Sequence, residues 1–266
     1  MVIVGISGGS GAGKSTVSKG LAKYLPNAVF IDVDPYFREA TEKLRPEVFR
    51  RMKVEQKDGV LDQNYYFDSL KNMMIWIDVI KDYVSNRIEE VVAKLGADKE
   101  YVIVDWCYLP MCDFFYKCDY TICVNADYET RYKRLANRMS KVKSYSLESG
   151  PSFYEYQPKA FANRVKYSAI DEYGYLSKYQ IKNDKDMESL NKSVKLIAEG
   201  IKTINSPVRY FEINKAQQNK VPNSVGFKAG YGILTRDNYK QERRTERKAI
   251  AQPPRSTSFG NTMDYR

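Results

Sequence analysis

The stretch Gly8-Gly9-Ser10-Gly11-Ala12-Gly13-Lys14-Ser15 decides the fold class of this 266-residue chain. It matches the phosphate-binding pattern G-x-x-x-x-G-K-S/T in full. An apolar run, Val2–Ile6, precedes it, and Lys14–Leu25 follows with apolar residues at helical spacing. The alternative is a glycine-rich turn that arises by chance, but such a turn would not need a strand before it and a helix after it. The sequence therefore predicts a P-loop between a buried strand and a helix.

The residue types of this loop suit a nucleoside triphosphate. Glycines let backbone N–H groups converge on a polyphosphate, and the following helix offers its positive dipole end to the same anion. We expect Lys14 to reach the β- and γ-phosphates and the Ser15 hydroxyl to ligate Mg²⁺. ATP and Mg²⁺ are thus the expected cofactors. The residues expected to hold the nucleotide are Gly8, Gly9, Ser10, Gly11, Ala12, Gly13, Lys14, Ser15 and Thr16.

Strands and helices alternate along the rest of the chain. Further strands are predicted at Ala28–Ile31, Tyr101–Asp105, Asp119–Val124 and Tyr179–Ile181. Helices are predicted from about 36 to 95, at Tyr128–Met139, around 159–172 and at Met187–Ile204. Such alternation predicts an α/β P-loop NTPase fold of the adenylate-kinase-like type, with a five-stranded parallel sheet and helices on both faces. We expect residues 1–204 to form this kinase domain, with a helical substrate lobe at 36–95 and a lid at 139–163.

Three carboxylates follow predicted strands, where the chemistry of open parallel sheets takes place. Asp32 and Asp34 follow the second strand, and Asp105 ends the third. Because the chain has no histidine, a general base must be Asp, Glu, Lys, Tyr or Cys. Asp105 is a candidate Mg²⁺ ligand, and Asp34 a candidate base. The alternative for an aspartate placed here is a turn former or helix cap.

Two arginines four residues apart, Arg134 and Arg138, share one face of a predicted helix. Their guanidinium groups could clamp phosphates and stabilise charge that develops in transfer. The alternative is a solvated basic helix face. Residues 140–158 follow, rich in Ser, Tyr, Lys, Gly and Pro and without an apolar period, which predicts a mobile loop.

The composition indicates a soluble globular protein. Hydrophobic residues make up 43% and charged residues 29%, and no apolar run approaches the ~18 residues of a membrane-spanning helix. The short apolar start is not typical of a signal peptide. The four cysteines form no C-x-x-C pair, so we interpret them as reduced core thiols. We expect a cytoplasmic protein that does not bind membranes.

The net charge of +10 is concentrated in residues 205–266, which carry twelve Lys/Arg against five Asp/Glu. Gln, Asn, Lys, Gly and Pro dominate there, which predicts a largely unstructured C-terminal extension. It could bind a protein partner, including a second copy of the chain. Nucleic acid is a less favoured partner, and a solvated basic tail without a partner is the third alternative.

From Val2 to about Ile204, the chain resembles the dephospho-coenzyme A kinases. The shared motifs are the P-loop; Ile31-Asp32-Val33-Asp34-Pro-Tyr-Phe-Arg38; Asp58-Gly59-Val60-Leu61; the stretch Tyr101–Arg138; and Ile181-Lys182-Asn183-Asp184. The resemblance implies that Asp34 is the catalytic base, that Arg38 contacts a small-molecule acceptor, and that Arg134 and Arg138 are lid arginines. It also implies that the turn at Asn183 contacts adenine.

The acceptor half of this resemblance is less complete than the nucleotide half. Gln63 stands where the family has Arg, Asp82-Tyr83 replaces a His-Pro pair, and Cys107–Met111 lacks the family's acid. The segment between Arg138 and Arg164 is roughly fifteen residues longer than is usual in the family. The P-loop followed by Asp-Pro-Tyr-Phe is also similar to uridine kinases, which phosphorylate a nucleoside. A third hypothesis is a catalytically weak nucleotide-binding module whose basic tail binds a partner.

Overall fold

The computed structural model describes residues 1–54, 63–143, 146, 150, 152–168 and 176–204. All of them belong to one unit, Met1–Glu212. The Asp58-Gly59-Val60-Leu61 motif and the whole 205–266 extension lie outside the described residues, so the expectations for them stay predictions. Within the part of the chain that the structure describes, no helix has the length and apolar character needed to cross a membrane.

The described strands form one parallel sheet in the order β2-β3-β1-β4-β5. Their bounds are β1 Val2–Ser7, β2 Ala28–Asp32, β3 Tyr101–Asp105, β4 Tyr120–Asn125 and β5 Tyr179–Lys182. All five lie within two residues of the predicted strands, which confirms the α/β P-loop fold. Since β1 pairs with β3 on one side and β4 on the other, the loop after β1 leaves the sheet at its centre.

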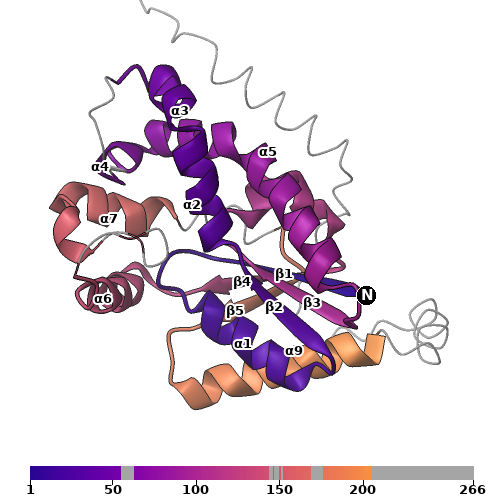
Figure 1. The fold of residues 1–266 in the computed structure, drawn as a ribbon. Helices are drawn as coiled ribbons and strands as arrows, with labels where there is room; N and C mark the ends of the chain where they lie inside the picture. The colour runs from indigo at the N-terminus through magenta and orange to yellow at the C-terminus, as the bar shows by residue number, and fades with distance from the viewer. Residues whose placement is uncertain (55–62, 144–145, 147–149, 151, 169–175, 205–266) are drawn as a thin grey trace, which may run out of the picture. The chain divides into compact units, whose positions relative to one another are not determined.

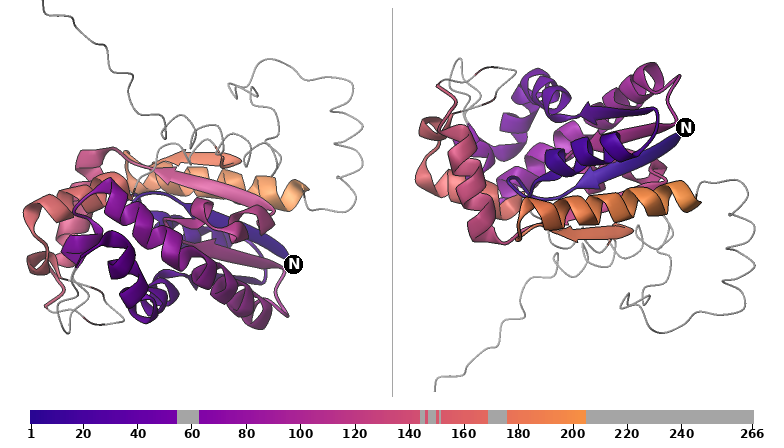
Figure 2. Two further views of the ribbon diagram at one scale, coloured as in Figure 1. Left: turned by 90° about the horizontal axis from the view of Figure 1, so that it is seen from above. Right: turned by 90° about the horizontal axis from the view of Figure 1, so that it is seen from below.

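Helices cover both faces of the sheet (Figure 1). The α-helices are α1 Lys14–Tyr24, α2 Asp34–Lys43, α3 Arg45–Met52, α4 Gln63–Tyr66, α5 Leu70–Leu95, α6 Tyr128–Met139, α7 Pro158–Tyr167 and α9 Met187–Ile204. Short 3₁₀ turns are η1 Leu109–Met111, η2 Asp113–Lys117 and η3 Phe153–Glu155. Helices α1 and α9 lie side by side on one face, where Gly20 contacts Val194 (Figure 2). Helices α2 and α5 lie on the other face.

Two apolar clusters form the core, one on each side of the sheet. The apolar stripe predicted for α5 is buried throughout, from Trp76 to Val92. The indole N–H of Trp76 donates to the Thr41 hydroxyl at 3.0 Å, which joins α5 to α2. This pairing is required because a buried indole N–H without an acceptor destabilises the fold.

Local sequence explains where the helices around the site begin and end. Asp127 caps α6 by accepting the backbone N–H of Thr130, and Ser69 caps α5 in the same way. Leu25 has left the helical conformation, as expected before Pro26, and α1 ends there. The region predicted to be helical from about 36 to 95, with an interruption at Asp58-Gly59, contains α2, α3, α4 and α5. Helix α7 begins at Pro158, inside the segment predicted as a lid.

Candidate functional site

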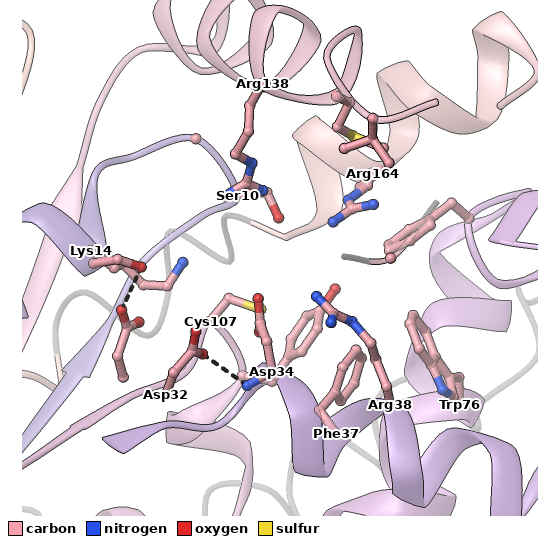
Figure 3. A pocket seen from close by; sticks show the side chains of 18 residues that line it. Ser10, Lys14, Asp32, Asp34, Phe37, Arg38, Trp76, Cys107, Arg138 and Arg164 are labelled. Atoms are coloured by element: carbon pink, nitrogen blue, oxygen red, sulfur yellow. Dashed lines mark hydrogen bonds between the residues drawn. The ribbon is translucent and has the colours of Figure 1, made fainter. Parts of the chain in front are cut away.

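A cavity of about 240 Å³ lies beyond the carboxyl ends of the strands (Figure 3). One end is formed by the P-loop side chains Ser10, Lys14 and Ser15, together with Asp105 at the end of β3. Residues of α2, α5, α6 and α7 and of several loops line the rest. The parallel sheet brings these residues together because all its strands end at the same edge.

The P-loop glycines are needed for their backbone geometry. Gly8 has φ +138°, and a Cβ there would lie 2.2 Å from the carbonyl oxygen of Val124. Gly13 has φ +102°, and a Cβ would lie 2.3 Å from Nδ2 of Asn183. Side chains rarely adopt such φ values, and neither contact leaves room for a methyl group. Gly13 also caps α1 without a side-chain acceptor, so no capping side chain competes with an anion for the N–H groups at the start of that helix.

Asp105 and Ser15, the two residues predicted to bind Mg²⁺, are hydrogen-bonded to each other. The Ser15 hydroxyl donates to Oδ2 of Asp105 at 2.9 Å, and the Ser18 hydroxyl lies 3.4 Å from the same oxygen. Asp105 is 3% exposed, and burial raises the pKa of its carboxyl to about 6, despite the opposing charge of Lys14. A divalent cation would favour the ionised form, so the site fits Mg²⁺. Among the described residues, no group of three or more acidic, Cys or His side chains could hold a metal, as expected if phosphates and water supply the other ligands.

The two aspartates after β2 play different structural roles. The backbone N–H of Asp34 donates to Oδ1 of Asp32 at 3.0 Å, so Asp32 forms the turn that begins α2. Loss of hydration, together with the charge of Asp34, raises the pKa of the Asp32 carboxyl. Asp34 is the first residue of α2 and its side chain does not cap the helix. Its carboxylate instead lies in the centre of the cavity wall (Figure 3).

The structure separates the two predicted lid arginines. Arg138 lines the cavity near Ser10 (Figure 3). Arg38 lines the opposite side of the cavity. Arg134 does not line it, and its Nη1 donates to the backbone carbonyl of Asn183 at 3.1 Å. The Asn183 amide in turn donates to the carbonyl of Ala12 at 2.7 Å. Arg134 and Asn183 thus support the P-loop in this structure, while the expected contacts of both with a nucleotide stay predictions.

Thr16 also lies outside the cavity. It lines an open hollow between α1 and the start of α9, together with Lys19 and Met187. Ser15 lines both the hollow and the cavity, so the two adjoin at the P-loop.

Sequence reasoning missed several residues of the cavity wall. Arg164 of α7 points into the cavity opposite Asp34 (Figure 3). In the sequence, Arg164 only marks the end of the extended segment that begins at Arg138. Cys107 also lines the cavity, and burial raises the pKa of its thiol to about 12, so it is a neutral neighbour of Asp34 at physiological pH. All four cysteines are free thiols. The aromatic wall consists of Phe37, Phe67, Trp76 and Tyr108.

The sheet order, the glycine loop and the Ser15–Asp105 pair define a P-loop nucleotide-binding protein. A family model described as "AAA domain" matches residues 4–150, more than half of the chain. The chain therefore belongs to this AAA domain family.

Similar proteins include two named uridine kinase. The one from Borreliella burgdorferi (strain ZS7) is 34% identical over 71 residues, which is 27% of this chain and 33% of the relative. The one from Borrelia garinii subsp. bavariensis has the same identity and coverage. The chain thus matches only about a third of these relatives' length. The crystal structure of TT1252 from Thermus thermophilus shares the fold, with a TM-score of 0.51 and 21% identity over 75% of this chain and 97% of that one.

Proposed function

We propose that the protein is an ATP-dependent kinase that transfers the γ-phosphate to a hydroxyl group of a small acceptor. One observation carries the proposal: the P-loop lysine, the Ser15–Asp105 pair and the Asp34 carboxylate all line the same cavity. Phosphoryl transfer needs this combination, because the phosphate must be held and neutralised on one side while a hydroxyl is oriented on the other. The length of the chain and its membership of the AAA domain family are compatible with kinase activity.

Several side chains of the cavity have a role in this reaction. The acceptor oxygen forms a bond to the γ-phosphorus as the bond to the β-γ bridging oxygen breaks, which releases ADP. Asp34 takes the hydroxyl proton, in agreement with its place in the wall and with the absence of histidine. Lys14 and Arg138 stabilise the negative charge of the transferred group. Mg²⁺, held by Ser15 and Asp105, would neutralise phosphate charge when bound.

The cavity wall narrows the class of acceptor. The wall combines the aromatic side chains with the guanidinium group of Arg38. Arginine in such a wall suits a carboxylate or phosphate, and aromatic rings suit an apolar or planar body. An acceptor that carries both an anionic group and a hydroxyl, as dephospho-coenzyme A and nucleotides do, is therefore our first candidate. A nucleoside is the second, favoured by the match to uridine kinases.

A coupled ADP-release assay tests the proposal. The panel should contain dephospho-coenzyme A, nucleoside monophosphates, uridine and small hydroxy acids, with Lys14→Ala as the inactive control. We expect one class to raise ADP release well above the acceptor-free rate, and the phosphorylated acceptor to be detectable by mass spectrometry. If ATP binds but no acceptor raises the rate above that of Lys14→Ala, the kinase proposal is wrong and the nucleotide-binding module is favoured.

A further inference from the structure

Helix α7 is held by two different parts of the molecule. Near its middle, Nδ2 of Asn163 donates to the carbonyls of Phe67 and Asp68, at 2.8 and 3.0 Å, in the segment before α5. Just after its last turn, the Ser168 hydroxyl accepts the backbone N–H of Ser10 at 2.9 Å. Ser10 belongs to the P-loop. Arg164 lies between these two attachments, so its position depends on both.

Arg131 of α6 strengthens the P-loop attachment. Its side chain is 6% exposed, its Nε donates to the carbonyl of Ala126 at 3.1 Å, and its Nη1 donates to the carbonyl of Val165. Val165 is the neighbour of Arg164, and its carbonyl also lies 3.4 Å from the Ser168 hydroxyl. The backbone of Arg131 packs against the P-loop as well, since a Cβ on Gly11 would lie 2.5 Å from the Arg131 carbonyl oxygen.

These contacts form a continuous link from the P-loop to the arginine that faces the cavity. A buried guanidinium that binds two backbone carbonyls at fixed directions is restrained, because each lost contact would remove an acceptor from a buried charged donor. Arg164 itself binds the Tyr156 hydroxyl and points into the cavity (Figure 3). Its distance from a γ-phosphate on the P-loop is therefore set by Arg131 and Ser168.

We infer that Arg131 and Ser168 are positioning residues, which hold Arg164 against the γ-phosphate bound by the P-loop. The inference rests on the proposed function, because it assigns Arg164 to the transferred phosphate. Neither residue is expected to touch the nucleotide. Both act through α7, so their effect should appear only when a γ-phosphate, or a group that mimics it, is present.

The test compares two ligands that differ only at the γ-position, ADP·Mg²⁺ and the ADP–beryllium fluoride complex, by titration calorimetry on the full chain. A charge-assisted hydrogen bond lost in Arg164→Ala should weaken the beryllium fluoride complex roughly 10- to 100-fold and leave ADP unchanged. Ser168→Ala should weaken only the beryllium fluoride complex, by about 2- to 10-fold, the scale of one neutral hydrogen bond. Arg131→Ala should show the same selectivity.

A double-mutant cycle separates positioning from a general loss of stability. Ser168→Ala should have no further effect when Arg164 is already alanine, because it acts through that residue. Val84→Ala is the control. Val84 is buried on α5, far in sequence from Arg131, Arg164 and Ser168, so its replacement lowers stability without changing the contacts between the P-loop and Arg164. If Arg131→Ala does not fold, Ser168→Ala still decides the question.

The possible failures are distinguishable. A wild-type chain that binds neither ligand contradicts the proposed function itself. A wild-type chain that binds both, with Ser168→Ala equally weak toward ADP and the mimic, overturns only the positioning role. Full additivity of Ser168→Ala with Arg164→Ala overturns it too.

Discussion

Replacing Asp105 with asparagine should stabilise the ligand-free protein at neutral pH and impair its function. Asp105 is 3% exposed, and its carboxyl has a pKa of about 6, against 3.8 for the ordinary residue. Burial is the main cause, because it disfavours the charged form. Asparagine keeps the size of the side chain and an oxygen that can accept from the Ser15 hydroxyl, but it removes the buried charge.

The magnitude follows from the shift of about two pKa units, which corresponds to about 3 kcal/mol. Below about pH 3 the carboxyl is protonated in both the folded and unfolded chain and contributes nothing. As the pH rises from 3.8 to about 6, the unfolded chain releases its proton while the folded chain keeps it, so the wild type loses stability relative to the variant. About 2 kcal/mol of this difference should develop between about pH 4.5 and about pH 8.

Urea unfolding at a series of pH values measures the effect, with Asp82→Asn, an exposed position on α5, as the matched control. The advantage of Asp105→Asn should grow with pH, whereas the control should stay near zero throughout. Adding ADP·Mg²⁺ at about 100 times its Kd should stabilise the wild type by about 2.7 kcal/mol and the variant far less. A variant that is destabilised equally at all pH values would refute the reasoning, since burial of charge would then not dominate at this site.

Three further predictions concern the P-loop and the acceptor. Lys14→Ala should lower phosphoryl transfer by at least about 3 kcal/mol of transition-state stabilisation, measured as kcat/KM once an acceptor is known, and wild-type turnover would contradict its role. Asp34→Asn should lose turnover but keep ATP affinity in calorimetry; an equal fall in both would place it at the metal or in the fold. Asn183→Ala leaves the Ala12 carbonyl without its donor, so the urea midpoint should fall by an amount equivalent to about 1–3 kcal/mol and nucleotide binding should weaken, whereas an unchanged midpoint would show that water replaces the amide.

The parts of the fold that sequence could predict are those specified by neighbouring residues. The P-loop, its flanking strand and helix, and the strand before Asp105 each have a continuous local pattern, and the structure confirms them. Asp34 could be singled out because it lies just beyond a strand and matches the position of the base in the family motif. The turn-forming role of Asp32, however, depends on which carboxylate accepts the backbone N–H, and that requires coordinates.

The rest of the candidate site depends on contacts between distant segments. Arg164 and the aromatic wall come from separate helices and loops, and none of these residues has a distinctive neighbourhood in the sequence. Arg134 and Arg138 look equivalent in the sequence because they share a helix face. The structure separates them because the loop after β5 brings the Asn183 carbonyl to Arg134 alone.

The packing of the P-loop has a consequence for how such sequences diverge. Gly8 and Gly13 are confined by Val124 and Asn183, which are parts of the protein itself and not of any ligand. Substitution there would damage the fold even in a descendant that had stopped using nucleotides. A complete glycine pattern would therefore persist after the catalytic activity has been lost. In this lineage, the loss of catalysis should first become visible at Lys14 and Asp34, whose side chains line the cavity.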